Sequence, residues 1–301
     1  MAKQKVVKFT VPATSANLGP GFDCLALALN IYDEVEMKLS DKISIQIKGE
    51  GEKELPKDEN NLMVASARRL FFEAGKPFQG MEIKLKKSIP VTKGLGSSSA
   101  AIATGLFGAN ELLNSPFSRD ELFNLASHME GHPDNAAAAF YGGFVVAWRQ
   151  NGSGKAVSFS PPSDLKIVLA IPDFQVYTVR ARSILPLVWP KEDVIYSLGR
   201  ACLLTAAMAS KKSDWLRSAC SDRLHEPYRG QLIPGYEDLR KMGMEAGALG
   251  VNISGSGPTI LTFATRNLDK IQKIMVDVFK KNKTKCVTVV TKPSPHGVKL
   301  R

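Results

Sequence analysis

The residues best suited to chemistry lie in residues 90–101, which read Pro-Val-Thr-Lys-Gly-Leu-Gly-Ser-Ser-Ser-Ala-Ala. Gly94 and Gly96 allow backbone angles and close approach that a side chain would forbid, so consecutive N–H groups can converge on an anion. Ser97, Ser98 and Ser99 follow at the predicted start of a helix, where free amides favour negative charge and a hydroxyl can reach a metal ion. The pattern predicts a phosphate-binding loop for a nucleoside triphosphate. A capped turn before a helix is the alternative.

This loop does not match the two best-known nucleotide-binding signatures. A Walker A loop ends in Gly-Lys-Ser/Thr, but the Gly-Lys pairs that begin at Gly75 and Gly154 are followed by Pro77 and Ala156. A dinucleotide fingerprint requires a third glycine at the position that Ser99 occupies here. The loop therefore predicts a different kind of phosphate site.

Two further glycine-rich segments cover residues 11–23 and 252–260. The first is predicted to be a long irregular turn after a strand, with Asn17 and Asp23 as its most capable hydrogen-bonding side chains. They could contact a substrate or satisfy the backbone of the turn. The second joins two predicted strands, and its glycines permit either a plain hairpin turn or the close approach of a ligand.

A histidine-containing segment, residues 127–139, offers Glu130 and Asn135. Its histidines do not have HExxH spacing and no PCxxC follows, so zinc is not expected. Glu130 suits Mg²⁺, a hard cation that takes carboxylate and phosphate oxygens, or it is a solvated glutamate near a helix end. Asn135 could cap the alanine-rich helix that follows it.

Two arginines in the second half could bind an anion. Arg182 and Arg229 carry planar guanidinium groups that match a carboxylate or a phosphate. Any single arginine can equally be a solvated surface group.

The composition indicates an ordinary globular protein. The chain has 301 residues, of which 44% are hydrophobic and 23% charged, which is enough for two domains. No apolar run is long enough to span a membrane, and no secretory signal precedes the first strand, so a cytoplasmic location and no membrane partner are expected. Four scattered cysteines are expected to be reduced. The net charge of +11 can attract nucleotides, and because aromatic residues do not interleave with the lysines, no nucleic-acid partner is expected.

Strand and helix signals alternate in the first half. Alternating apolar residues predict strands over 7–11, 35–39 and 43–47, the last two joined as a hairpin by a turn at residues 40–42. Helical spacing over 61–74 ends at Gly75, and a strand over 81–85 leads to the glycine loop. A capping box of Ser118 and Glu121 opens a helix that runs to Met129, and a strand ends at Trp148.

The second half is predicted to be a separate unit. Residues 150–155 form the most linker-like stretch, so the domains are placed at 1–155 and 156–301. Strands are predicted over 166–171, 249–254, 258–264 and 286–291, with helices over 191–210, 214–220, 235–246 and 267–281. Without the additional helices this order is βαββαβ, which is ferredoxin-like.

Taken together, the three glycine-rich segments resemble the motifs of the GHMP kinase family, named for its galactokinase, homoserine kinase, mevalonate kinase and phosphomevalonate kinase members. Residues 11–23, 90–101 and 252–260 match the family's three motifs in order, across essentially the whole chain. The resemblance implies an α+β, two-domain fold: an N-terminal ribosomal-protein-S5-domain-2-like domain and a C-terminal ferredoxin-like βαββαβ domain with helical insertions.

Within the family, the chain is most similar to the members that phosphorylate homoserine. It has a first motif like theirs, Ser-Ala-Asn-Leu-Gly-Pro-Gly-Phe-Asp, at residues 15–23, Glu-Gly-His-Pro-Asp-Asn at 130–135, and the segments 178–182 and 225–229. This resemblance implies ATP-dependent phosphorylation of L-homoserine to O-phospho-L-homoserine in threonine biosynthesis, with Mg²⁺, by a homodimer. Periodicity alone identifies no dimer interface.

The resemblance also assigns roles to residues. Homoserine would contact Asn17, Asp23, Asn135, Arg182 and Arg229, with the arginines on its carboxylate and Asp23 on its ammonium. Ser98 and Glu130 would bind Mg²⁺, and these two with Asn135 would form the catalytic set. ATP would contact Asn61, near the adenine, together with Pro90, Val91, Thr92, Lys93, Gly94, Leu95, Gly96, Ser97, Ser98, Ser99 and Ala100.

The proton acceptor for the substrate hydroxyl is not a carboxylate in this chain. Other members of the family use an aspartate in the region where this chain has Asn135, and an amide cannot take up a proton as a carboxylate can. We therefore expect the proton to pass to the γ-phosphate or to solvent while Asn135 orients the hydroxyl. Phosphoryl transfer depends mainly on positioning and electrostatic stabilisation, which is compatible with this arrangement.

Three other functions are compatible with parts of the pattern. A GHMP kinase could act on another alcohol, such as a diphosphocytidyl-methylerythritol or a mevalonate-pathway substrate. A sensor could keep the fold without transferring phosphate. A nucleic-acid binder would use the positive charge, and its affinity would fall steeply with salt.

Overall fold

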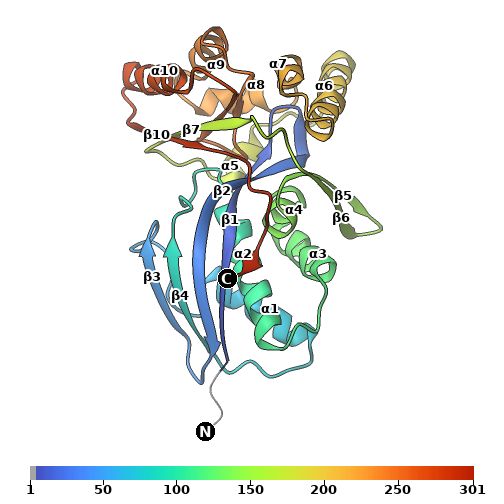
Figure 1. Ribbon diagram of the computed structural model, residues 1–301, viewed down its shortest axis with the longest axis vertical. Coiled ribbons are helices and arrows are strands. Elements are labelled where there is room, and N and C mark those ends of the chain that lie inside the picture. The colour runs from blue at the N-terminus through green and yellow to red at the C-terminus, as the bar shows by residue number, and fades with distance from the viewer. Residues whose placement is uncertain (1–4) are drawn as a thin grey trace.

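Two sheets lie one above the other along the long axis of the molecule (Figure 1). The computed structural model describes residues 5–301. Among these residues no helix combines the length and the apolar composition needed to cross a membrane. The first sheet and its helices form the N-terminal domain, and the second sheet with its helices forms the C-terminal domain.

The N-terminal sheet has seven strands within the described residues, in the order β11-β1-β2-β4-β3, with β5 pairing with β2 and β6 pairing with β5. These are β1 (Val6–Asn17), β2 (Gly21–Leu39), β3 (Ser44–Gly49), β4 (Met81–Lys87), β5 (Phe144–Gln150), β6 (Ser153–Phe159) and β11 (Lys299–Leu300). Alternation along β1 and β4 buries Val7, Phe9, Ile83 and Leu85 on the inner face.

Four helices cover the inner face of this sheet: α1 (Leu62–Glu73), α2 (Ser97–Leu112), α3 (Arg119–Glu130) and α4 (Asp134–Tyr141). The predicted capping box is present at the start of α3, where Ser118 accepts from the backbone N–H of Glu121. Helix α2 is apolar almost all round, and Gly105 lets it lie directly against the backbone of α1 at Met63. The phosphate-loop residues at the start of α2 are thereby fixed from inside the domain.

The C-terminal sheet has four strands in the order β10-β7-β9-β8, all antiparallel. They are β7 (Lys166–Pro172), β8 (Gly250–Ile253), β9 (Ile260–Ala264) and β10 (Cys286–Thr291). With α9 (Tyr236–Glu245) and α10 (Leu268–Lys281) this is the predicted ferredoxin-like arrangement. The inserted helices are α5 (Thr178–Ser183), α6 (Lys191–Ala209), α7 (Leu216–Ala219) and α8 (Glu226–Arg229), and two 3-10 turns cover Ser213–Trp215 and Gly230–Leu232.

The predicted hairpin between residues 35–39 and 43–47 is wrong. Strand β3 pairs with β4 in parallel, and β4 lies between β3 and β2. The helix α1 connects β3 to β4, as a parallel pair requires a crossover. Alternation identified the strands and their buried faces, but it carries no information about which strands are neighbours.

The predicted irregular turn over residues 11–23 is shorter than expected. Strand β1 continues through Asn17 and β2 begins at Gly21, so only residues 18–20 form the turn. Asn17 and Asp23 flank it with φ of 71° and 56°, in the left-handed region that asparagine and aspartate tolerate. The two side chains are therefore held at fixed strand ends.

The stretch interpreted as a linker, residues 150–155, is a β-hairpin. Asn151 and Gly152 both have positive φ, 52° and 79°, as a tight turn between β5 and β6 requires. A domain boundary between residues 155 and 156 would cut β6, which belongs to the N-terminal sheet. We propose instead a division after Phe159, with the chain returning to the first sheet at β11.

Candidate active site

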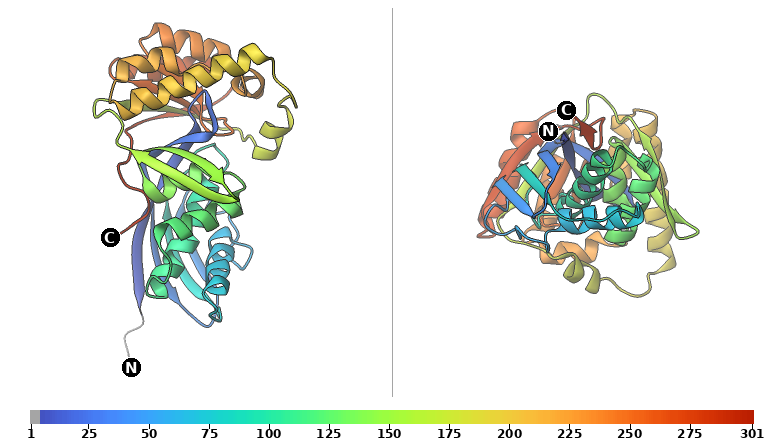
Figure 2. Two further views of the ribbon diagram at one scale, coloured as in Figure 1. Left: turned by 90° about the vertical axis from the view of Figure 1, so that its right-hand side faces the viewer. Right: turned by 90° about the horizontal axis from the view of Figure 1, so that it is seen from below.

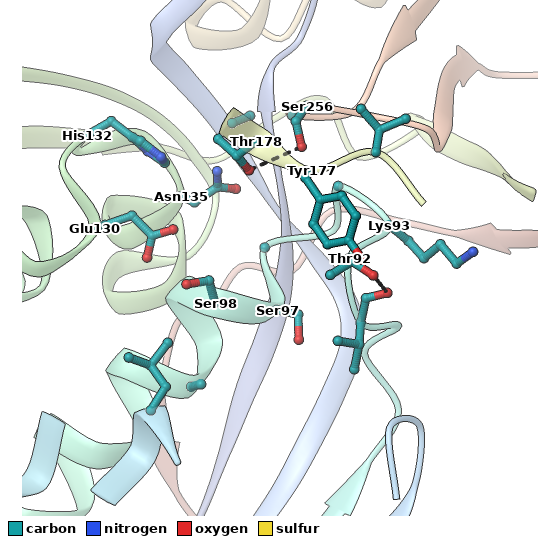
Figure 3. Close-up of a pocket in the computed structure, with 18 of the residues that line it drawn as sticks. Thr92, Lys93, Ser97, Ser98, Glu130, His132, Asn135, Tyr177, Thr178 and Ser256 are labelled. Carbon is teal, nitrogen blue, oxygen red and sulfur yellow. Dashed lines mark hydrogen bonds between the residues drawn. The ribbon is translucent and has the colours of Figure 1, made fainter. Parts of the chain in front are cut away.

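A cavity of about 390 Å³ lies where the two domains meet. It is lined by the three glycine-rich segments, by the ends of α1 and α3, and by α5. Of the predicted site residues, the following line it: Asn17, Asp23, Asn61, Val91, Thr92, Lys93, Gly94, Gly96, Ser97, Ser98, Glu130, Asn135, Arg182 and Arg229. Figure 3 shows part of this wall from within.

The three glycine-rich segments are hydrogen-bonded to one another. The N–H of Thr14 donates to the carbonyl of Leu95 at 3.1 Å, and the N–H of Gly255 donates to the carbonyl of Ala16 at 3.1 Å. The hydroxyl of Ser254 lies 2.7 Å from the carbonyl oxygen of Gly94 and 2.7 Å from the hydroxyl of Ser15. The first and third segments therefore hold the phosphate loop in place.

The two glycines of the loop are required by space as well as by conformation. Gly94 and Gly96 have φ of 76° and 69°. A Cβ at Gly94 would meet the carbonyl oxygen of Ser254, and one at Gly96 would overlap the hydroxyl of Thr14. The plain-turn interpretation of the loop accounts for the angles but not for these close approaches between segments.

Four predicted loop residues do not line the cavity. Leu95 and Ala100 point into the hydrophobic core, and Ser99 is buried beneath the start of α2. Pro90 is half-buried at the entry to the loop. Lys93 lines the cavity, but its ammonium donates to the carbonyls of Pro172 and Phe174, away from the loop centre (Figure 3).

A cation site fits beside the loop, where Ser98 and Glu130 face one another (Figure 3). Oε2 of Glu130 and Oγ of Ser99 are buried with no hydrogen-bond partner of normal geometry in the described part of the chain. Burial raises the pKa of Glu130, while His132 and the nearby Ser99 and Ser98 hydroxyls oppose that rise. Residues 5–301 contain no cluster of three or more His, Cys, Asp or Glu side chains that could hold a metal ion.

The cavity lining also includes an ion pair between Asp23 and Arg182. Both terminal guanidinium nitrogens of Arg182 donate to the carboxylate, at 2.9 and 2.7 Å, in a bidentate pair that is partly exposed to the cavity. The hydrogen bonds to Asp23 raise the pKa of Arg182. The site thus places a positive and a negative group side by side.

Arg229 lies behind this pair and is buried. Its Nε donates to the carbonyl of Ala181 at 3.1 Å and one terminal nitrogen donates to the carbonyl of Gly255 at 3.0 Å. Burial lowers its pKa to about 10, so the group keeps its charge at neutral pH. Its guanidinium carbon lies 4.9 Å from the centre of the Phe22 ring, a cation–π contact.

Asn17 connects the segments through its side chain. Its Oδ1 accepts from the N–H of Asp23 at 3.0 Å, and its Nδ2 donates to the carbonyl of Gly255 at 2.9 Å. This agrees with the interpretation that Asn17 satisfies backbone groups, and the same bonds fix Asp23 beside Arg182. Asn17 is therefore a positioning residue in the structure, at the edge of the cavity.

Asn61 is the N-cap of α1. Its Oδ1 accepts from the N–H of Met63 at 3.0 Å and its amide donates to the carbonyl of Pro56 at 2.6 Å. Around it, apolar side chains of Leu55, Leu62 and others make this end of the cavity suited to a flat aromatic base.

Among the residues at or beside the site that were not singled out from the sequence are Thr14, Phe22, His132 and Asp134. The hydroxyl of Thr14 donates to Oδ1 of Asn135 at 2.7 Å, and Nδ1 of His132 lies 2.8 Å from the Asp134 carboxylate. Burial acts to lower the pKa of His132, but the hydrogen bond to Asp134 and the charge of that carboxylate raise it above its ordinary value. All four lie within residues 11–23 or 127–139. Their position in these two segments was the sequence signal that could have identified them.

Comparison with known proteins agrees with this architecture. The family profile described as GHMP kinases N terminal domain matches residues 61–143, and that described as GHMP kinases C terminal matches residues 204–281. Fold and site together define a two-domain small-molecule kinase, and the chain belongs to the GHMP kinase family.

Its relatives in that family include a protein named homoserine kinase from Moorella thermoacetica, 40% identical over 95% of this chain and 97% of the relative. A protein of the same name from Carboxydothermus hydrogenoformans is 39% identical over 95% of this chain and 94% of its own length. The crystal structure of homoserine kinase from Cytophaga hutchinsonii has a TM-score of 0.88 and 33% identity, and covers 100% of this chain and 99% of that one.

Proposed function

We propose that this protein transfers the γ-phosphoryl group of ATP to the hydroxyl of L-homoserine, giving O-phospho-L-homoserine and ADP in threonine biosynthesis. The observation that carries the proposal is that one cavity joins the glycine loop to the Asp23–Arg182 pair. The names of relatives that are about 40% identical over most of the chain support the same activity. A cytoplasmic location belongs to this proposal.

The acceptor end suits a zwitterion. An amino acid presents a carboxylate and an ammonium on one carbon, and the site presents an arginine and an aspartate within hydrogen-bond distance of each other. Homoserine would exchange this internal pair for two new pairs, with its ammonium on Asp23 and its carboxylate on Arg182 and Arg229. A substrate that lacks an ammonium, such as mevalonate, would leave Asp23 without a new partner.

The phosphate end would hold ATP. Backbone N–H groups of residues 91–98 and the start of the 16-residue helix α2 would bind the phosphates, with the adenine toward Asn61. Ser98 and Glu130 would hold Mg²⁺, which when bound neutralises charge on the phosphates. The glycine contacts with Ser254 and Thr14 keep this cradle rigid before ATP arrives.

The substrate hydroxyl would be oriented by Asn135. Because Oδ1 of Asn135 already accepts from Thr14, its amide nitrogen is the group left to donate to the hydroxyl oxygen. The hydroxyl proton would then leave to the γ-phosphate or to solvent as the P–O bond forms and the bond to ADP breaks.

Homoserine-dependent release of ADP tests this function. The purified chain is assayed with ATP and Mg²⁺ against homoserine, mevalonate and diphosphocytidyl-methylerythritol at equal concentrations. Turnover with homoserine alone is expected. Turnover with one of the other alcohols and none with homoserine would assign a different GHMP kinase activity, and ATP binding without any turnover would indicate a sensor.

A further inference from the structure

The turn between β1 and β2, residues 18–20, extends from the N-terminal sheet into the C-terminal domain. In Figure 2 (left) this dark blue end of the strand pair lies among the orange helices of the C-terminal domain. Gly19 in the turn has φ of 84°, and a Cβ there would meet the carbonyl oxygen of Cys220 and the side chain of Asn252. Residues of the C-terminal domain therefore fix the position of the first residues of β2.

His225, the N-cap residue of α8, holds this turn from the C-terminal side. Its Nε2 lies 2.8 Å from the carbonyl oxygen of Gly19, and because that oxygen can only accept, Nε2 carries the proton. The side chain is completely buried, and its Nδ1 has no hydrogen-bond partner in the described part of the chain. Burial lowers the pKa of His225 to about 4, so the imidazole is neutral at neutral pH.

The carboxylate of Asp222 fixes the backbone from which this imidazole extends. Its Oδ2 accepts from the N–H groups of His225 at 2.7 Å and Glu226 at 2.9 Å. The hydroxyl of Ser197, on α6, donates to its Oδ1 at 3.1 Å. The Asp222 side chain is itself completely buried. The position of His225 is therefore set by α6 and by the start of α8 together.

The imidazole of His225 also stacks on the ring of Phe22, with ring centres 5.2 Å apart and planes at 25°. The guanidinium carbons of Arg229 and Arg182 lie over the same ring, 4.9 and 5.6 Å from its centre. Arg229 follows His225 by one helical turn, and its N–H donates to the His225 carbonyl at 2.9 Å. Phe22 directly precedes Asp23, the ion-pair partner of Arg182. One aromatic ring thus contacts the histidine and both arginines of the acceptor site.

The contacts of this ring matter because the two arginines repel each other. Burial, and after it the charge of Arg182, lowers the pKa of Arg229. The negative face of the Phe22 ring attracts both guanidinium groups and offsets part of their repulsion. A neutral imidazole can hold the ring in place without adding a third positive charge. A carboxylate that bridges two guanidinium groups needs both at a fixed separation, so a small displacement of the ring weakens its binding.

We propose that His225 is a positioning residue of the acceptor site, which acts through Phe22 to place Arg182 and Arg229 for the carboxylate of the substrate. The inference rests on the proposed function for the identity of that substrate. His225 is not among the residues that line the cavity, so its effect on the substrate is indirect. Its two contacts have different consequences: the hydrogen bond to Gly19 stabilises the fold, and the stacking on Phe22 sets the affinity for homoserine.

Two substitutions separate these contacts. His225→Gln keeps an N–H donor for the carbonyl of Gly19 but removes the ring, and is expected to raise the KM for homoserine about tenfold with the KM for ATP unchanged. His225→Phe keeps a ring but leaves that buried carbonyl unpaired, so it is expected to have the lower Tm of the two and a KM for homoserine close to wild type. Phe279→Leu, a buried change outside the cavity lining, is the control for lost stability and should alter the Tm alone.

Phe22→Leu tests the same role from the other side of the stacking contact. Phe22 is only half-buried, so this variant remains informative if a substitution at His225 prevents folding. It is expected to raise the KM for homoserine as His225→Gln does, and the double variant should show little further increase because both changes remove one contact. A wild-type KM for homoserine in Phe22→Leu, or KM and Tm that change together in His225→Gln and His225→Phe, would overturn the proposal.

A spectroscopic measurement distinguishes failure of this inference from failure of the proposed function. No turnover of homoserine by the wild-type chain would contradict the function alone. The ¹H–¹⁵N signal of the Arg229 Nε–H, assigned with Arg229→Lys, reports the ring directly because the guanidinium lies over Phe22. The signal should shift in His225→Gln and Phe22→Leu and stay near its wild-type position in His225→Phe. An unchanged signal in His225→Gln would show that the imidazole does not position the ring.

Discussion

The hydroxyl of Thr14, on β1, donates a 2.7 Å hydrogen bond to Oδ1 of Asn135, in the first turn of α4. Thr14 is completely buried, and its hydroxyl also fills the space that a side chain at Gly96 would need. One threonine thus touches both the residue assigned to the acceptor hydroxyl and the loop assigned to the phosphates. Several expected outcomes depend on this relationship.

Thr14→Val should lower kcat without changing the fold. Valine has nearly the same shape but cannot donate, so the amide of Asn135 loses the bond that fixes its orientation. A loss of about 1 kcal/mol corresponds to roughly a fivefold fall in kcat. Steady-state kinetics measure this, and Thr14→Ser, which keeps the hydroxyl, should retain most of the activity.

Asn135→Asp should not create a faster enzyme. A carboxylate beside the phosphates and next to Asp134 adds like charge, so kcat is expected to fall by about tenfold or more. The pH dependence of kcat measures the role of the residue. A rise of orders of magnitude, with the profile of a carboxylate base, would contradict proton transfer to phosphate or solvent.

Gly96→Ala should abolish nucleotide binding because its Cβ would overlap Thr14. Gly75→Ala is the matched control: Gly75 has a similar φ, 61° against 69°, but nothing lies within 4 Å of its Cβ position. Both variants carry the conformational cost of about 1 kcal/mol. Isothermal titration with ATP and thermal unfolding separate the two effects, and equal ATP affinity in both variants would show that crowding at Gly96 is unimportant.

Arg182→Gln should raise the KM for homoserine and leave the KM for ATP unchanged. Loss of a charged hydrogen-bonding partner predicts an increase of about 10- to 100-fold. Arg180→Gln, on the same short helix but exposed to solvent, is the control and should behave like wild type. A similar KM for homoserine in the two variants would remove Arg182 from the acceptor site.

The stability of the chain should fall as the pH rises toward 8 because of Glu226. Burial raises its pKa from 4.5 to about 8, and Asp222 adds to the rise. The stabilisation from this raised pKa is complete below about pH 4.5 and is lost as the pH rises through about 8. The Tm of Glu226→Gln, measured against wild type from pH 5 to 8.5, should therefore improve progressively with pH.

An internal control for this experiment is His225, which lies in the same buried cluster. Burial lowers its pKa from 6.5 to about 4, so its contribution is lost as the pH falls through that interval. Glu226→Gln should leave this acid-side decline in place. A difference in Tm between variant and wild type that does not change with pH would contradict the raised pKa of Glu226.

Local signals in the sequence predicted most strands and most of the longer helices, but not β6 or β11, and they drew attention to the glycine loop. Gly94 and Gly96 are recognisable because they are needed for backbone geometry within one short segment. The sequence did not show which distant segments pair with each other. Alternation predicted strand β3 but not its parallel pairing with β4. Asn151-Gly152 was misread as part of a linker because turn residues in a hairpin and in a linker are the same types.

In the candidate site, too, local features could be predicted from the sequence but contacts between distant residues could not. The sequence predicted Asp23 and Arg182 as site residues through the resemblance, but not that they bind each other across 159 positions of chain. Thr14 was overlooked because a buried threonine in a strand has no distinctive pattern. Its role depends on Asn135 and Gly96, which only the folded chain brings together.

The return of the chain to the N-terminal sheet at β11 affects the order in which the domains can fold during synthesis. Val298 donates its N–H to the carbonyl of Ala139, and β11 pairs with β1 at Phe9 and Thr10. On the ribosome these contacts form only after the whole C-terminal domain has been synthesised. The N-terminal domain of this chain therefore emerges first but is completed last.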